Sequence, residues 1–236
     1  MKNDVICKSC GHSNPFHQLT CLNCKSYLRE RVYNIDLWKT LEHLIESPVK
    51  AFTRIIHSEQ KNFVVFILLI SAIKFFVNTI FFFLLESQNQ LTNIKIVRNY
   101  LIGLSAAIIL LMIFVYLIYL TNRVSGNSAR VKDIFSVLTY SLSPNVFALI
   151  LLFPLELIFF GEYLFSNNPS PFAIKEITAY IFLTLESMII VWTIFLSIMA
   201  IYTLTKSLVY SIATGLGYIC SLYFVQYLLS FYLLKY

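Results

Sequence analysis

Five long apolar stretches, separated by short polar segments, dominate the chain after residue 61. A helix needs about 20 mostly apolar residues to cross the roughly 30 Å hydrocarbon core of a bilayer, and these stretches approach or exceed that length. The pattern therefore predicts five membrane-spanning helices, over residues 62–85, 101–120, 144–161, 179–203 and 207–234.

The third stretch contains a predicted helix boundary. Its apolar region begins near Ile134, but Ser143 and Pro144 resemble an N-cap followed by proline at the first helical position. We therefore expect a short interfacial helix over residues 131–142 that leads into the third span. Pro154 is expected to kink that span further.

Residues 36–57, ahead of the first span, place apolar side chains three and four positions apart. This spacing predicts an amphipathic pair of helices, divided at Ser47 and Pro48. The favoured interpretation is that the apolar stripe lies on the membrane surface. The alternative is that the stripe packs on the N-terminal segment or on the spans themselves.

Composition supports the membrane assignment. Hydrophobic residues make up 58% of the 236 residues and charged residues 13%, whereas soluble domains carry roughly 45–50% and about 25%. A soluble globular domain is excluded. The expected fold class is an all-α polytopic membrane protein, with an N-terminal module over residues 1–30, interfacial helices over 31–61 and a five-span domain over 62–236.

The basic residues flanking the spans indicate orientation. Thirteen lysines and arginines fall on the side of the N-terminus and four on the other side, the latter being Lys95, Arg98, Lys175 and Lys235. Because positive residues collect on the cytoplasmic side, we expect a cytoplasmic N-terminus. Five spans then place Tyr236 on the opposite side, and a prokaryotic source would make this the cell membrane.

Two C-x-x-C hooks near the N-terminus form the strongest local motif. Cys7 and Cys10 are followed after ten residues by Cys21 and Cys24, and two such hooks can enclose one tetrahedral ion. We expect a zinc ribbon with one structural zinc ion and keep iron as the alternative. So short a segment cannot bury a core of its own, so the metal must stabilise it. Cytoplasmic thiols are not expected to form disulfides.

The turns after the two hooks differ. Gly11 follows the first hook and permits the positive φ that such a turn favours, whereas Lys25 stands at the matching place after the second. His12 and His17 are expected at the surface, because four thiolates already complete a tetrahedral shell.

Three ionisable residues lie inside the predicted spans: Lys74, Glu156 and Glu186. Each costs roughly 2.5–3.5 kcal/mol to insert and should face protein or water rather than lipid. Lys74 and Glu186 have similar estimated depths, which favours a structural ion pair. An ion or proton path is the functional alternative.

Small residues in the second and fifth spans could allow close approach of two helices. They are Gly103, Ala107, Ser211, Ala213, Gly215 and Gly217.

Several catalytic arrangements are absent from the sequence. No histidine follows His57, so the membrane domain has no Ser-His or Cys-His dyad and no histidine-ligated zinc or haem site. There is also no P-loop and no G-x-G-x-x-G motif. We therefore expect that the protein is not an enzyme.

The chain resembles the YIP (Ypt-interacting protein) family of five-span membrane proteins. The resemblance rests on 47–52 (SPVKAF) with Arg54 and Ile55, on 135–144 (FSVLTYSLSP), on Trp192, and on 206–208 (KSL). It covers roughly residues 45–236. A zinc ribbon ahead of such a domain is similar to the prokaryotic branch, whereas eukaryotic relatives lack the ribbon, bind small GTPases of the Rab type and act in vesicle traffic. We match no GTPase-binding motif to the cytoplasmic segment.

The leading hypothesis is a non-enzymatic membrane scaffold or adaptor whose ribbon recruits a cytoplasmic protein or contacts the membrane surface, with a role in membrane organisation or trafficking. The alternative is a small transporter or channel subunit that uses Lys74, Glu156 and Glu186. Lipid is the expected environment, and a homo-oligomer stays open. Nucleic acid is not an expected partner, because acids dilute the basic residues of the ribbon.

Overall fold

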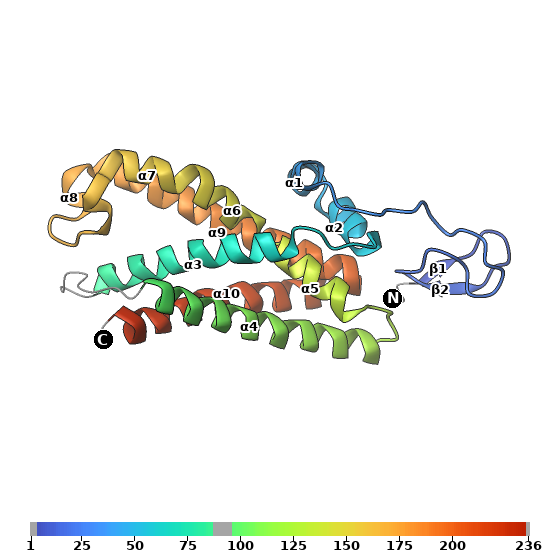
Figure 1. Cartoon of the computed structure of the whole chain (residues 1–236). Helices are drawn as coiled ribbons and strands as arrows, with labels where there is room; N and C mark the ends of the chain where they lie inside the picture. Colours follow the sequence, from blue (N-terminus) through green and yellow to red (C-terminus); the bar gives the residue numbers. More distant parts are fainter. Residues whose placement is uncertain (1–3, 87–95, 235–236) are drawn as a thin grey trace. The chain divides into compact units, whose positions relative to one another are not determined.

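The computed structural model describes residues 4–86 and 96–234, which form a short β-hairpin followed by helices (Figure 1). Strands β1 and β2 pair antiparallel, with Val5 opposite Asn14. The elements are, in chain order, β1 (Asp4–Ile6), β2 (Ser13–Pro15), α1 (Leu37–Glu46), α2 (Pro48–His57), α3 (Val64–Glu86), α4 (Ile96–Val124), α5 (Val131–Tyr140), α6 (Ser143–Phe147), the π-helical η1 (Ala148–Leu152), α7 (Phe153–Phe160), the 3-10 helix η2 (Gly161–Phe165), α8 (Pro171–Ile174), α9 (Glu176–Thr205) and α10 (Leu208–Leu234).

Five helical segments of the described chain are long and apolar enough to cross a membrane, as predicted. They are Val64–Leu84, Ile96–Val124, Val131–Phe165, Glu176–Thr205 and Leu208–Tyr232. In each of these segments the apolar side chains lie on all faces of the helix and do not form a single stripe. This is expected of helices that contact lipid on one side and protein on the other. Lys95, Lys235 and Tyr236, which entered the prediction of orientation, lie outside the described residues.

The third span differs from its predicted bounds. The candidate span begins at Val131, because α5, the turn at Ser141 and Leu142, and α6 form one helical series. Seven of the ten residues of the expected interfacial helix, α5, are buried in the protein. Ser143 is the first residue of α6 and not its cap, since Leu142 occupies the N-cap position.

A wide helical turn precedes Pro154 in the third span. Residues Ala148–Leu152 form the π-helical η1, and Pro154 stands in the first turn of α7. Proline removes a backbone donor and crowds the carbonyl four residues earlier, which a π-turn accommodates. This irregularity lies where Pro154 was predicted to distort the helix.

The chain divides into two compact units, which we describe separately. The first unit comprises residues 1–65, of which 1–3 are not described, 111–141 and 195–218. Its helices α2 and α5 contact each other, and several of their apolar side chains are fully buried. The buried side chains are those of Phe52, Ile55, Ile56, Ile134, Val137 and Leu138.

The second unit comprises residues 66–110, 142–194 and 219–236, of which the last two and 87–95 are not described. Its core is largely aromatic. The rings of Phe147 and Trp192 stack at 5.7 Å, and Phe182 packs edge-on against Phe160 at 5.8 Å. These contacts join α6, α7 and α9.

The amphipathic segment forms the two predicted helices, with Ser47 between them. Ser47 donates its backbone N–H to His43, and its carbonyl accepts from Lys50 and Ala51, so it ends α1 and begins α2. The apolar face of α2 is buried and α2 contacts α5, as in the alternative in which the stripe packs on the spans. On α1, by contrast, Trp38 and Ile45 remain 78% and 60% exposed.

Candidate metal centre and intramembrane ion pair

The two cysteine hooks fold as equivalent turns. In the first, Cys7 O accepts the N–H of Gly11 at 2.9 Å, and in the second Cys21 O accepts the N–H of Lys25 at 3.1 Å. Both turns end on a left-handed residue, with φ of 71° at Gly11 and 61° at Lys25. Lysine pays a steric cost in that conformation that glycine avoids, as the sequence comparison of the two hooks predicted.

These turns bring the four thiols together. The Sγ atoms of Cys7, Cys10, Cys21 and Cys24 all lie within 4.8 Å of one another. The distances between Cys7 and Cys24 and between Cys10 and Cys21 are both 3.6 Å. In a tetrahedral tetrathiolate with metal–sulfur bonds of about 2.3 Å, neighbouring sulfurs are about 3.8 Å apart. The cluster can therefore hold one metal ion.

Two polar residues that sequence analysis missed support the cysteines. The buried Asn14 amide donates to Cys21 Sγ at 3.6 Å and to His12 O at 2.8 Å, while its Oδ1 accepts the N–H of Leu22. These bonds tie β2 to the second hook. Asn14 and the second residue, Ser26, carry no sequence signal that distinguishes them from other polar residues of a loop.

The hydroxyl of Ser26 lies 3.2 Å from Cys7 Sγ and 3.0 Å from Cys24 Sγ. Its hydrogen bond, together with nearby backbone donors, lowers the pKa of Cys7 to about 5. A thiol that readily becomes a thiolate is suited to bind a metal. His12 is exposed as expected, and neither His12 nor His17 belongs to the cluster.

The ribbon is attached to the ends of the long helices through Phe16. The Phe16 N–H donates to Ser128 Oγ at 3.2 Å, and Phe16 O lies 3.2 Å from His57 Nε2. Because a carbonyl oxygen only accepts, Nε2 of His57 carries the proton. The Phe16 ring packs on the His57 ring at 4.8 Å and lies beneath Lys206 Nζ. All these residues belong to the first unit.

A buried ion pair connects the segment before α3 to α5, and sequence analysis did not identify it. Lys61 Nζ lies 3.0 Å from Asp133 Oδ1, with side chains 6% and 1% exposed. Lys61 also donates to the carbonyls of Ile55 and Ile56 at the end of α2. Asp133 in turn accepts from Arg130 at 2.7 and 3.2 Å. The only available signal was that Asp133 is the one acid within an apolar helix.

Within the second unit, Lys74 of α3 and Glu186 of α9 form the ion pair expected from their depths. The distance from Nζ to Oε1 is 2.6 Å, and the side chains are 1% and 21% exposed. Each group thus provides the opposite charge that the other needs in an apolar environment.

Glu156 is not part of this pair. It lies in α7, is 5% exposed, and its Oε2 has no hydrogen-bond partner among the described residues. It does lie within electrostatic range of Glu186 and Lys74. The structure therefore brings two of the three predicted intramembrane residues into contact and leaves the third near them.

A small cavity of about 20 Å³ lies among α3, α4 and α10 in the second unit, with Gly103 and Gln226 in its walls. Both amide atoms of Gln226 are buried without partners in the described chain. The volume suits roughly one water molecule. Gln226 was another residue missed by sequence analysis.

Comparison with known proteins identifies one family. The family model described as the Yip1 domain matches residues 43–233. The matched region begins within α1 and includes all five candidate spans, while the four cysteines precede it. No match was found among curated proteins or among solved structures.

Proposed function

Because the chain belongs to the Yip1 domain family of membrane proteins, we propose that it is a non-enzymatic membrane scaffold or adaptor. Its five-helix domain anchors it in the bilayer, and its ribbon presents a surface to a cytoplasmic protein. The observation that carries this proposal is the attachment of Phe16 to His57 and Ser128. A partner bound to the ribbon is thereby held at a defined place on the membrane domain.

The surface of the ribbon supports protein binding. Ile6, Leu22 and Tyr27 of the ribbon are 70%, 50% and 75% exposed. We propose that these side chains contribute to one apolar surface, because contiguous exposed apolar area marks interaction sites. These three residues are the ones we expect a partner to cover.

A site-specific crosslinking experiment in cells tests this role. A photoreactive amino acid replaces Leu22 or Tyr27, and the matched control places it at the equally exposed Trp38 of α1. We expect one discrete protein adduct from each ribbon position, and its loss when Cys7→Ser and Cys24→Ser are combined. Adducts only with lipid or with a second copy of the chain would contradict the adaptor role.

We further propose that the ion in the ribbon is zinc. A set of four thiolates in two hooks favours Zn²⁺, although iron accepts the same ligands. About one zinc per chain is expected by elemental analysis of the purified protein. Cys7→Ser with Cys24→Ser should abolish the metal content, and Cys220→Ser is the matched control that should keep it. A control-like metal content in the double variant, or bound iron, would contradict the assignment.

The adaptor role requires a cytoplasmic ribbon, which the distribution of lysine and arginine supports. Reporter fusions at residues 1 and 127 should both give a cytoplasmic signal, and a fusion at residue 236 the opposite one. A cytoplasmic signal at residue 236 would contradict the five-span topology.

The exposed apolar residues of α1 suggest a second contact. Trp38 and Ile45 are seven positions apart and therefore lie on one face of the helix. We propose that this face rests on the membrane surface, because tryptophan favours the interface and only residues 47–63 separate α1 from the first span.

The alternative function is a small transporter or channel subunit. Glu156 favours it, because a buried carboxyl group with an unpartnered oxygen can exchange a proton. The direct bond between Lys74 and Glu186 favours the structural interpretation of those two residues. Ion or solute flux in liposomes that disappears with Glu156→Gln would support transport, and unchanged flux would remove Glu156 from consideration.

A further inference from the structure

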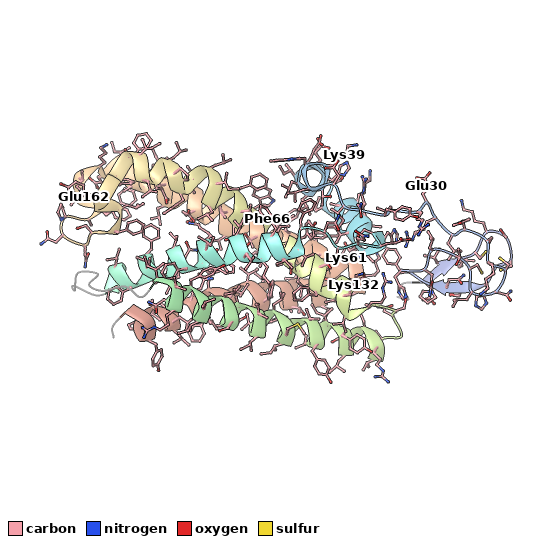
Figure 2. All side chains as sticks on the ribbon, in the orientation of Figure 1. Glu30, Lys39, Lys61, Phe66, Lys132 and Glu162 are labelled. Atoms are coloured by element: carbon pink, nitrogen blue, oxygen red, sulfur yellow. The ribbon has the colours of Figure 1, made fainter. Side chains whose placement is uncertain are left out.

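A group of cations lies where the membrane-spanning helices end in the first unit. Lys61 stands three residues before α3, Lys132 is the second residue of α5, and Lys206 directly follows α9. Residues this close to the ends of spans lie at the depth of the lipid headgroups. Figure 2 labels Lys61 and Lys132, one beside the start of α3 and the other on α5.

The group has an excess of positive charge. We call it the junction patch, and its six cations are Arg29, Arg31, Lys61, Arg130, Lys132 and Lys206. Among the described residues, two carboxylates form ion pairs with members of this group. Glu59 pairs with Arg31 at 2.7 Å, and Asp133 is shared between Lys61 and Arg130. Six cations against these two carboxylates leave an excess of four positive charges, and Arg29, Lys132 and Lys206 form no ion pair among the described residues.

Neutral groups hold three of these cations in place. Arg29 donates to the carbonyls of His17 and Gln18 at 3.0 and 3.2 Å. Lys132 donates to Glu59 O at 2.9 Å, and Lys206 Nζ lies over the rings of Phe16 and Tyr202. These contacts fix the side chains without neutralising their charge.

The cations also oppose one another. Burial lowers the pKa of Arg29, and the charge of Arg130 acts in the same direction. Burial likewise lowers the pKa of Lys61, where Asp133 opposes the charges of Arg130 and Lys132. These like charges repel one another, and a bound anion would offset that repulsion.

We propose that the junction patch binds the phosphate group of an anionic phospholipid in the leaflet on the N-terminal side. The charge of the patch is complementary to such a headgroup, and its depth matches that of the phosphates. Each lysine or arginine near an anionic surface strengthens such an interaction. This lipid site is independent of any protein bound to the ribbon.

Lipid titration of the detergent-purified, metal-loaded full chain tests the site. The probes are a short-chain phosphatidylglycerol and the phosphatidylcholine of equal chain length, and the readouts are the shift in Tm and the lipid retained in native mass spectrometry. We expect phosphatidylglycerol to raise Tm at a lower concentration than phosphatidylcholine does. The difference should shrink as NaCl is added.

Two matched double variants distinguish the effect of charge in the junction patch from the effect of the total charge of the protein. Lys132→Gln with Lys206→Gln removes two charges from the patch, and Lys39→Gln with Lys50→Gln removes two from α1 and α2. We expect the first variant to weaken phosphatidylglycerol binding roughly 25-fold, at about fivefold per charge, and the second to leave it close to the original value. If the first variant does not fold, Lys132→Arg with Lys206→Arg must retain the lipid preference.

Several outcomes would overturn the proposal. They are equal effects of the two lipids, equal losses in the two glutamine variants, or loss of the preference in the arginine variant. Inorganic phosphate as effective as phosphatidylglycerol would point to a free anion instead. Displacement of the lipid by a short oligonucleotide at lower concentration would assign the patch to nucleic acid.

Discussion

Lys74 and Glu186 meet at 2.6 Å, although 112 positions separate them in the chain. The bond joins α3 to α9 in the second unit. Lys74 is completely buried, whereas about a fifth of the Glu186 side chain is exposed. The two residues thus share a contact but not an environment.

This contact makes a prediction for a double-mutant cycle. Glu186→Met should destabilise the protein by about 3 kcal/mol, because it leaves the buried Lys74 ammonium without a partner. Lys74→Met should also be destabilising, because Glu186 lies within a membrane span, where lipid and not water covers its exposed part. The combined variant should recover much of the loss, as measured by thermal unfolding in detergent. Additive losses would show that the two residues do not stabilise each other.

The two hook turns predict opposite effects of two substitutions. Lys25→Gly should stabilise the metal-bound ribbon by about 1 kcal/mol, because it relieves a lysine held at φ 61°. Gly11→Ala should destabilise it by a similar amount, because it places a Cβ at φ 71°. The measurement is metal retention against a chelator of graded concentration. Equal retention by the two variants would mean that backbone strain does not limit the ribbon.

Gly215 is expected to be far more sensitive than Gly103. A Cβ on Gly215 would lie 2.8 Å from Ile198 Cγ1 and 3.1 Å from Ile198 backbone atoms, so Gly215→Ala should push α9 from α10 and cost about 1–3 kcal/mol. Gly103→Ala meets nothing within 4 Å and should be neutral or slightly stabilising. Tm values of the two variants in detergent check this order, and a larger loss for Gly103→Ala would refute it.

His57 predicts a dependence of stability on pH. Burial lowers its pKa to about 4 from an ordinary value of 6.5, and the charge of Arg29 contributes. Between these values the unfolded chain binds a proton that the folded chain does not. The contribution of the neutral His57 ring to the free energy of unfolding is therefore complete above about pH 6.5. It is lost as pH falls toward 4, by at most about 2 kcal/mol for this partly exposed ring.

Thermal unfolding at pH 7 and pH 5 measures this effect. His57→Gln removes the titrating group and keeps an amide that can donate to Phe16 O, so its stability should decline less on acidification. Metal content is measured in the same samples, because acid also releases metal from thiolates. Equal declines in the two proteins, at equal metal content, would assign the pH dependence to other groups.

The spans and the ribbon were predictable because their signals are local. An apolar run of sufficient length must form a helix in the membrane, because only a helix satisfies its backbone hydrogen bonds without help from neighbours. Two C-x-x-C hooks each form a local turn that presents two thiols to a metal ion. The depth of Lys74 and Glu186 was predictable too, because the fixed rise per residue of a helix converts sequence position into depth. These features required no knowledge of which helices are neighbours.

The tertiary structure alone decided which faces meet. The apolar stripe of α2 was evident, but its contact with α5 and the burial of Asp133 beside Lys61 depend on how two distant helices are rotated. For the same reason Gly215 lies against Ile198 whereas Gly103 lines a cavity, although both were equal candidates as small residues. Hydrophobic pattern and helical rise specify length and depth along one helix, but only the packing of side chains from separate segments specifies the partner of each face.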